Sequence, residues 1–274
     1  MEITIPRSPN LKSKGLLPSD ACVWLPPQYH QNPEAHFPAI DMQDGQNLFY
    51  PERSYTNITW GVAETISKLS QWGFIRSVIV VGIDNTTNRR GDYPPTQPFE
   101  IAEGKGFVER LQKTLPKVYQ RVKFVSDQYV QLMVEIIKPR NDQDFRTSTK
   151  REDTIVLGSS MGGLISLYVL IQRPLTFGAA GYLSTHWPTM GDFSIPYLQR
   201  NLPAAGKHRI YYDHGTHGLD VGYPHYQHAV DEVMRKKGYV QGKDWLTRFA
   251  PGVDHHERAW HSRLHIALRF LLGT

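Results

Sequence analysis

The sequence predicts an α/β fold with a mostly parallel central sheet and helices on both faces. Short apolar segments rich in β-branched residues alternate with helix-like segments through most of the chain, which is typical of a parallel sheet buried on both sides. One apolar run, residues 155–157, passes through a glycine-rich turn directly into residues with helical apolar spacing. At 274 residues and 31.4 kDa the chain can bury one large core, so we expect a single domain spanning residues 1–274.

The expected strands and helices follow from these apolar patterns. The strands are predicted, in chain order, at residues 23–25, 37–40, 77–83, 155–157, 177–183, 209–212 and 245–249. Helices are predicted directly after residues 155–157 and at residues 225–237 and 257–272.

A long interval separates the third expected strand from the fourth. It begins with a proline-rich loop at residues 92–98 and continues with apolar residues at helical spacing between Phe107 and Val118, broken by Pro116. A second apolar group, between Tyr129 and Ile137, is expected to form a helix that packs on the core. Because long insertions in compact folds often cover active sites, residues around 86–131 are a candidate helical lid.

The glycine-rich turn reads GSSMG at residues 158–162 and matches the pattern G-x-S-x-G. When a strand turns this sharply into a helix, the pivot residue is strained and exposed, and the flanking glycines allow the chain segments to pass closely. Ser160 is therefore the candidate nucleophile. The backbone N–H of Met161, at the helix N-terminus, is a candidate oxyanion-hole donor.

A serine nucleophile requires a general base and a carboxylate that orients it. After an elbow of this kind, the acid and then the histidine are expected on loops that follow later strands. His255 and His256 follow the last predicted strand, so one of them should be the base. For the acid we favour Asp220, which lies past two glycines and has the reach to meet that histidine, over Asp213, which directly follows residues 209–212.

A second oxyanion-hole donor is expected from the loop after the second predicted strand. Its sequence, DMQDGQN at residues 41–47, provides a glycine and unhindered amides, so the backbone of Gly45 or Gln46 is the candidate donor. An Asp-Gly pair is equally typical of a plain turn, and the local sequence does not distinguish the two.

Taken in order, these segments resemble the esterase branch of the α/β-hydrolase superfamily, which includes esterase D and the feruloyl, acetylxylan and siderophore esterases as well as the mycolyltransferases. The resemblance extends over nearly the whole chain. It rests on residues 42–49, 81–85 with Arg89 and 92–94, 138–139 with 145–147, 158–164, 213–216 and 255–260.

The resemblance implies the α/β-hydrolase fold and assigns further residues. In this branch the base is the histidine of a His-x-Glu-x-x-Trp pattern, which falls on His255, and the acid lies in the loop that contains Asp220. The segment around Arg89 matches a feature near the active-site mouth, which makes Arg89 a candidate substrate contact. Trp187 follows the strand at residues 177–183 and is a second candidate.

The function expected from these residues is that of a serine hydrolase, which cleaves the carboxylic ester of a small molecule through an acyl-enzyme. An acyltransferase would use the same three residues. A hydrolase fold that only binds a ligand is the other alternative, because folds are reused for unrelated functions.

Composition limits the other classes. The net charge of +5 is scattered, which does not favour a nucleic-acid partner, and no apolar run approaches the roughly 18 residues of a membrane span. Cys22 is the only cysteine, and we expect no metal and no cofactor, since protein groups suffice for the chemistry. The N-terminus lacks the features of a secretory leader, so we expect a cytoplasmic protein, or a periplasmic or secreted one if a leader has been removed. Nothing in the sequence indicates the oligomeric state.

Overall fold

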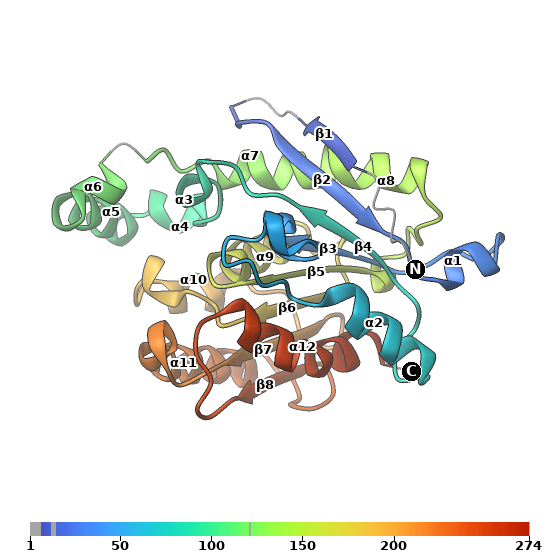
Figure 1. Ribbon diagram of the computed structural model, residues 1–274. Coiled ribbons are helices and arrows are strands. Elements are labelled where there is room, and N and C mark those ends of the chain that lie inside the picture. Colours follow the sequence, from blue (N-terminus) through green and yellow to red (C-terminus); the bar gives the residue numbers. More distant parts are fainter. Residues whose placement is uncertain (1–6, 12–14, 121, 274) are drawn as a thin grey trace.

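The computed structural model describes residues 7–11, 15–120 and 122–273, in which helices pack on both faces of a central sheet (Figure 1). Within these residues lies an eight-stranded sheet in the order β1-β2-β4-β3-β5-β6-β7-β8. The strands are β1 (Arg7–Leu11), β2 (Ser19–Trp24), β3 (Ala39–Gln43), β4 (Ile79–Ile83), β5 (Thr154–Ser159), β6 (Ala179–Leu183), β7 (Arg209–His214) and β8 (Trp245–Phe249).

The sheet is mostly parallel, as the sequence predicts. Strands β3 to β8 pair in parallel, while β2 pairs antiparallel with β4 and with the edge strand β1. All seven predicted strands are present, with ends shifted by a few residues. Strand β1 is not among the predicted ones, since its sequence RSPNL lacks an apolar pattern.

The helices and helical turns connect these strands. They are α1 (Gln28–Gln31), η1 (Gly45–Asn47), η2 (Pro51–Arg53), α2 (Val62–Gln71), α3 (Arg89–Asp92), α4 (Thr96–Glu100), α5 (Ala102–Thr114), α6 (Pro116–Tyr119), α7 (Ser126–Gln131), the π-helical turn η3 (Leu132–Ile137), α8 (Lys138–Asp144), η4 (Arg151–Asp153), α9 (Met161–Gln172), η5 (Trp187–Thr189), α10 (Ser194–Asn201), η6 (Gly218–Gly222), α11 (Tyr223–Lys236) and α12 (Glu257–Leu272).

Helices cover both faces of the sheet because successive strand residues point to opposite sides. Val81, Val156 and Tyr212 pack in one core cluster with residues of α7, α9, α10 and α11. Their strand neighbours Val80 and Tyr211 pack in the other cluster with residues of α2 and α12. Figure 1 shows α2 and α12 together on one face, with α7 and α8 on the other.

The described residues between β4 and α7 form four helices, α3 to α6, and Figure 1 shows α5 and α6 at one extremity of the molecule. An aromatic cluster joins this interval to the residue before α10. The rings of Phe99 and Phe107 lie 5.7 and 5.2 Å from that of Phe193. The second apolar group forms a continuous helical stretch, α7-η3-α8, in which Tyr129, Met133 and Ile137 are buried.

No helix among the residues that the structure describes has the length and apolar character needed to cross a bilayer.

Candidate active site

The predicted site residues lie in the loops, helical turns and first helical residues that follow the carboxyl ends of the parallel strands, where open α/β sheets bind their ligands. Ser160 stands between β5 and α9, with φ 55° and ψ −124°. A positive φ is rare for a residue with a side chain and indicates local strain. The crossing depends on the two glycines of the motif: a Cβ on Gly158 would lie 2.3 Å from the carbonyl oxygen of Gly162.

His255 links Ser160 to an acidic side chain. Its Nε2 lies 2.9 Å from Ser160 Oγ, and its Nδ1 lies 2.6 Å from Asp220 Oδ1. Asp220 is fully buried, whereas the His255 side chain is 9% exposed. Neighbouring His256 caps the start of α12, where its Nδ1 accepts a hydrogen bond from the Arg258 N–H.

The Asp220 carboxylate is held in its ionised form by hydrogen bonds. Burial raises its pKa, but donors from His255, from the Ser184 hydroxyl and from the Gly215 N–H outweigh burial, so the pKa lies below its ordinary value. Ser184 Oγ and Gly215 N both donate to Oδ2 at 2.6 Å, which leaves Oδ1 for the imidazole.

Asp213, the other candidate acid, has different partners. It is fully buried at the end of β7, where its Oδ1 lies 3.0 Å from Arg263 Nε and its Oδ2 accepts a hydrogen bond from the Tyr211 hydroxyl. Burial raises its pKa above the ordinary value despite the ion pair with Arg263.

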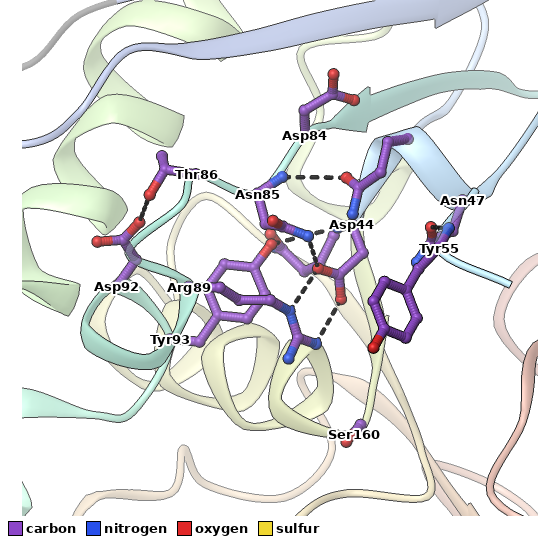
Figure 2. A network of polar contacts seen from close by, with 12 residues as sticks. Asp44, Asn47, Tyr55, Asp84, Asn85, Thr86, Arg89, Asp92, Tyr93 and Ser160 are labelled. Carbon is purple, nitrogen blue, oxygen red and sulfur yellow. Dashed lines mark hydrogen bonds and ion pairs between the residues drawn. The ribbon is translucent and has the colours of Figure 1, made fainter. Parts of the chain in front are cut away.

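The loop after β3 brings a second ion pair to the elbow (Figure 2). Asp44 adopts the left-handed conformation, with φ 57°, and accepts two hydrogen bonds of 2.7 Å from Nε and Nη2 of Arg89. A Cβ on Gly162 would lie 3.0 Å from Asp44 Oδ2, so this carboxylate is next to the first turn of α9. Arg89 thus neutralises a charge near the positive end of that helix.

Gly45 and Gln46 follow Asp44 in the turn η1. A Cβ on Gly45 would lie 2.5 Å from the backbone carbon of Gly82, so only glycine allows this loop to pack directly on β4. The side chain of Gln46 accepts a hydrogen bond from the Asn85 N–H at 3.2 Å. The loop is therefore anchored to β4 beside α9, and Met161 begins α9, where the first N–H groups have no partner within the helix.

Rings from three elements surround the His255 imidazole. His186, Tyr223 and Trp260 have ring centroids 6.4, 5.8 and 5.1 Å from it. His186 Nδ1 lies 2.5 Å from the Tyr223 hydroxyl. Burial, helped by the charges of His255 and Arg89, lowers the pKa of His186 to about 4, so this second imidazole is neutral at physiological pH.

Trp187 is the one predicted site residue whose side chain the structure does not bring to these groups. Its indole is 1% exposed and lies 6.3 Å from the Tyr212 ring within the core. The physical reason is that Trp187, the first residue of η5, packs in the core cluster that contains Tyr212, while neighbouring His186 lies beside His255.

Four side chains of the site have no distinct sequence signal: Ser184, His186, Tyr223 and Arg263. Each lies outside a motif, and their contacts depend on the approach of β6, β7, α11 and α12 in space. A position just after a predicted parallel strand is the only signal that could have indicated Ser184 and His186. In the part of the chain that the structure describes, no cluster of three or more His, Cys, Asp or Glu could hold a metal ion.

The chain resembles known proteins along most of its length. Residues 19–271 match the sequence model of a family described as "Putative esterase". The uncharacterized protein YbbA of Bacillus subtilis (strain 168) is 21% identical over 258 residues, which cover 92% of this chain and 91% of YbbA.

Solved structures share the fold. A ferulic acid esterase superposes with a TM-score of 0.70 and 15% identity, covering 99% of both chains. An IroE-like serine hydrolase from Shewanella oneidensis superposes with a TM-score of 0.68 and 18% identity, covering 97% of this chain and 79% of the other. The chain thus belongs to this esterase family of the α/β-hydrolase superfamily and is a carboxylic-ester hydrolase.

Proposed function

We propose that the protein hydrolyses a small-molecule ester through an acyl-enzyme formed on Ser160, with His255 as general base and Asp220 as the acid that orients it. The observation that carries this proposal is the unbroken hydrogen-bonded line from Ser160 Oγ through both nitrogens of His255 to Asp220 Oδ1. A donor-acceptor chain of this kind is what a serine needs to become a nucleophile at neutral pH.

The reaction follows from these positions. Ser160 Oγ attacks the ester carbonyl carbon as its proton passes to His255 Nε2, and the carbonyl oxygen becomes an oxyanion. Collapse of the tetrahedral intermediate breaks the bond to the alcohol oxygen, which takes the proton from His255. Water then attacks the acyl-enzyme with His255 again as the base, which releases the acid and restores Ser160.

The oxyanion requires donors that are in place before the reaction. We propose the N–H of Met161, at the start of α9, and an N–H from Gly45 or Gln46 in the adjoining turn. An unpaired Asp44 carboxylate beside this position would repel the developing negative charge. The two hydrogen bonds from Arg89 cancel that repulsion, so the ion pair protects the oxyanion hole.

Arg89 is also the proposed contact for a polar part of the substrate. Its bonds to Asp44 use Nε–H and one N–H of Nη2, so the second N–H of Nη2 and both N–H groups of Nη1 are the donors it can offer. Because α3, which carries Arg89, opens the interval of α3 to α6, we propose that residues around 86–131 form a lid that limits the size of the ester. Phe99 and Phe107 of this interval contact Phe193, which lies between β6 and α10. These contacts support a position of the lid next to the connection that follows β6.

The test compares two adjacent serines. Hydrolysis of a panel of aryl, sugar-acetate and catecholate esters is measured for the wild type, Ser160→Ala and Ser159→Ala. Ser160→Ala should lower kcat/KM by roughly 10⁴-fold or more, because it removes the nucleophile. Ser159→Ala is the matched control and should stay within about 10-fold of the wild type, since Ser159 is buried in β5.

Circular dichroism and urea unfolding of both variants show whether the fold is intact. Wild-type rates in a folded Ser160→Ala variant would contradict the assignment of the nucleophile.

A further inference from the structure

A buried network continues behind the Asp220 carboxylate, and the proposed mechanism does not use it. Ser184 Oγ lies 2.6 Å from Asp220 Oδ2 and 2.6 Å from Arg263 Nη2. Ser184 and Asp220 are fully buried, and Arg263 is 5% exposed. A buried arginine is costly unless it is paired, so its position in this network requires a reason.

The chemistry of the guanidinium fixes the direction of each hydrogen bond. Arginine has donors and no acceptor, so Ser184 Oγ must accept from Arg263. The single hydroxyl proton of Ser184 is therefore donated to Asp220 Oδ2. Arg263 therefore sets the rotation of the Ser184 hydroxyl and strengthens it as a donor through cooperative polarisation.

Asp213 anchors the other side of the guanidinium. Its Oδ1 lies 3.0 Å from Arg263 Nε, and it is held by the Tyr211 hydroxyl at 3.1 Å and by the Ser184 N–H at 3.3 Å. The two acidic residues that compete in the sequence thus occupy the two ends of one network. Asp220 faces the imidazole, and Asp213 neutralises the cation behind it.

We propose that Arg263 is a positioning residue for the hydrolysis: through Ser184 it holds the Asp220 carboxylate so that Oδ1 faces His255 Nδ1, and the balance between Arg263 and Asp213 sets how readily His255 takes up a proton. This inference rests on the proposed function, because it assigns His255 as the base. It adds two residues, Arg263 and Ser184, and a role for Asp213.

Other groups around the base are the same in all the variants used to test this. His186 and Tyr223 contact the His255 ring, and His256 and Glu257 follow it in the chain, where Glu257 Oε2 accepts a hydrogen bond from the Thr56 hydroxyl. Near Arg263, the positive charge of Arg248 on β8 also acts on Tyr211. On the other side of the base, the positive charge of Arg89 acts on His186.

The experiment follows protonation of His255 directly by NMR in protein labelled with ¹³C at histidine Cε1, the His255 signal being assigned with His255→Gln. Arg263→Met removes a cation, so the midpoint of the His255 titration should move up by roughly 0.5–1 pH unit. Asp213→Asn leaves the cation uncompensated, so the midpoint should move down by a similar amount. In the double variant the two changes should largely cancel, because the pair is removed together.

Two further variants separate this effect from a loss of structure. Ser184→Ala removes the donor to Asp220 Oδ2, which strengthens the remaining hydrogen bond to the imidazole, so the midpoint of the His255 titration should rise. This variant should fold even if Arg263→Met does not. Arg146→Met is the matched control: this arginine bonds to the carbonyl oxygens of Tyr29 and Asn32 and stacks on Tyr29. It should lower stability and leave the His255 titration unchanged.

The acid limb of the kcat/KM profile should shift in the same directions as the NMR midpoints. Equal midpoints in the wild type, Ser184→Ala, Arg263→Met and Asp213→Asn would overturn the proposal, as would a shift of the same sign in the last two. If the midpoint moves up in Arg263→Met and down in Asp213→Asn but the wild type hydrolyses no ester, the network is retained and the proposed function is overturned instead.

Discussion

The two candidate acids, Asp213 at the end of β7 and Asp220 beyond it, have different partners, and these partners determine what each residue can do. Asp220 lies on η6 and directs one carboxylate oxygen at the imidazole, while Asp213 is bound to Arg263 and Tyr211. The expected division is that Asp220 orients the base during catalysis and Asp213 balances a buried charge.

Exchange of each acid for its amide tests this division. Asp220→Asn should lower kcat by roughly 10³- to 10⁴-fold, because an amide in that place favours the wrong tautomer of the base. Asp213→Asn should cost stability, since it leaves a buried arginine without its counterion, while kcat well above the titration midpoint of the base falls by less than about 10-fold. Steady-state kinetics and urea unfolding of both variants provide the comparison, and the reverse order of rate losses would refute it.

At this scale the sequence predicts positions better than contacts. Ser160 could be predicted from its motif. The order of strands limits the base to His255 or His256, and the family resemblance selects His255. Between Asp213 and Asp220 the local sequence indicates only reach along a loop, and the family resemblance also favours Asp220. Ser184 and Arg263 could not be predicted, since their hydrogen bonds depend on how β6 and α12 approach the loop after β7.

The junction of β5 with α9 is the element on which the geometry of the site depends. Gly158 and Gly162 let the end of the strand and the first turn of the helix touch, because any side chain on Gly158 would overlap the carbonyl oxygen of Gly162. This contact holds Ser160 at its strained φ of 55°.

Alanine substitutions measure how strictly the junction of β5 with α9 requires glycine. Gly158→Ala should lower the free energy of unfolding by about 1–3 kcal/mol and should reduce activity, because the elbow must shift to admit a methyl group. The control is Gly106→Ala within α5, where a Cβ would meet no atom within 4 Å. It should raise stability by about 0.5–1 kcal/mol. Thermal or urea unfolding measures both changes in stability. A Gly158→Ala variant as stable as the wild type would show that the crossing of β5 and α9 is not tight.

Elements with a clear apolar period were predictable, and those without one were not. The parallel strands and α9, α11 and α12 follow from β-branched runs and helical spacing. The π-helical turn η3, at Leu132–Ile137, could not be predicted, because its hydrogen bonds span five residues and an ordinary helical period does not show them. Strand β1 has little apolar character, and only its pairing with β2 makes it a strand.

At the scale of the whole molecule, one acidic residue, Asp41, is buried at the centre of the sheet. Asp41 lies on β3 between β4 and β5, is 4% exposed, and its Oδ2 has no hydrogen-bond partner among the described residues. Burial raises its pKa to about 7, with Lys138 acting in the opposite direction and Asp142 adding to the rise. The folded protein therefore binds this proton more tightly than the unfolded chain does.

The consequence is a stability that falls as the pH rises towards 7. In the unfolded chain Asp41 is ionised above about pH 4, while in the folded protein it becomes ionised only near pH 7. Between about pH 5 and pH 8 the wild type should lose about 2–3 kcal/mol of unfolding free energy more than Asp41→Asn does. Urea titrations at both pH values measure this difference. An identical pH dependence of the two proteins would contradict a protonated Asp41.

At the scale of the molecule, the sequence predicted the layered architecture and the edge where the site lies, because alternation of strands and helices leaves few other arrangements. It did not predict the aromatic contacts of Phe99 and Phe107 with Phe193, which join segments far apart in the chain.

The central claim is that Ser160 becomes covalently acylated. The most direct measurement is to treat the protein with a fluorophosphonate and to locate the adduct by peptide mass spectrometry, with His255→Gln as a second sample. We expect one adduct, on Ser160 and not on Ser159, and much slower labelling of His255→Gln, because the serine then lacks its base. An active protein with no adduct, or with the adduct on another residue, would contradict the account.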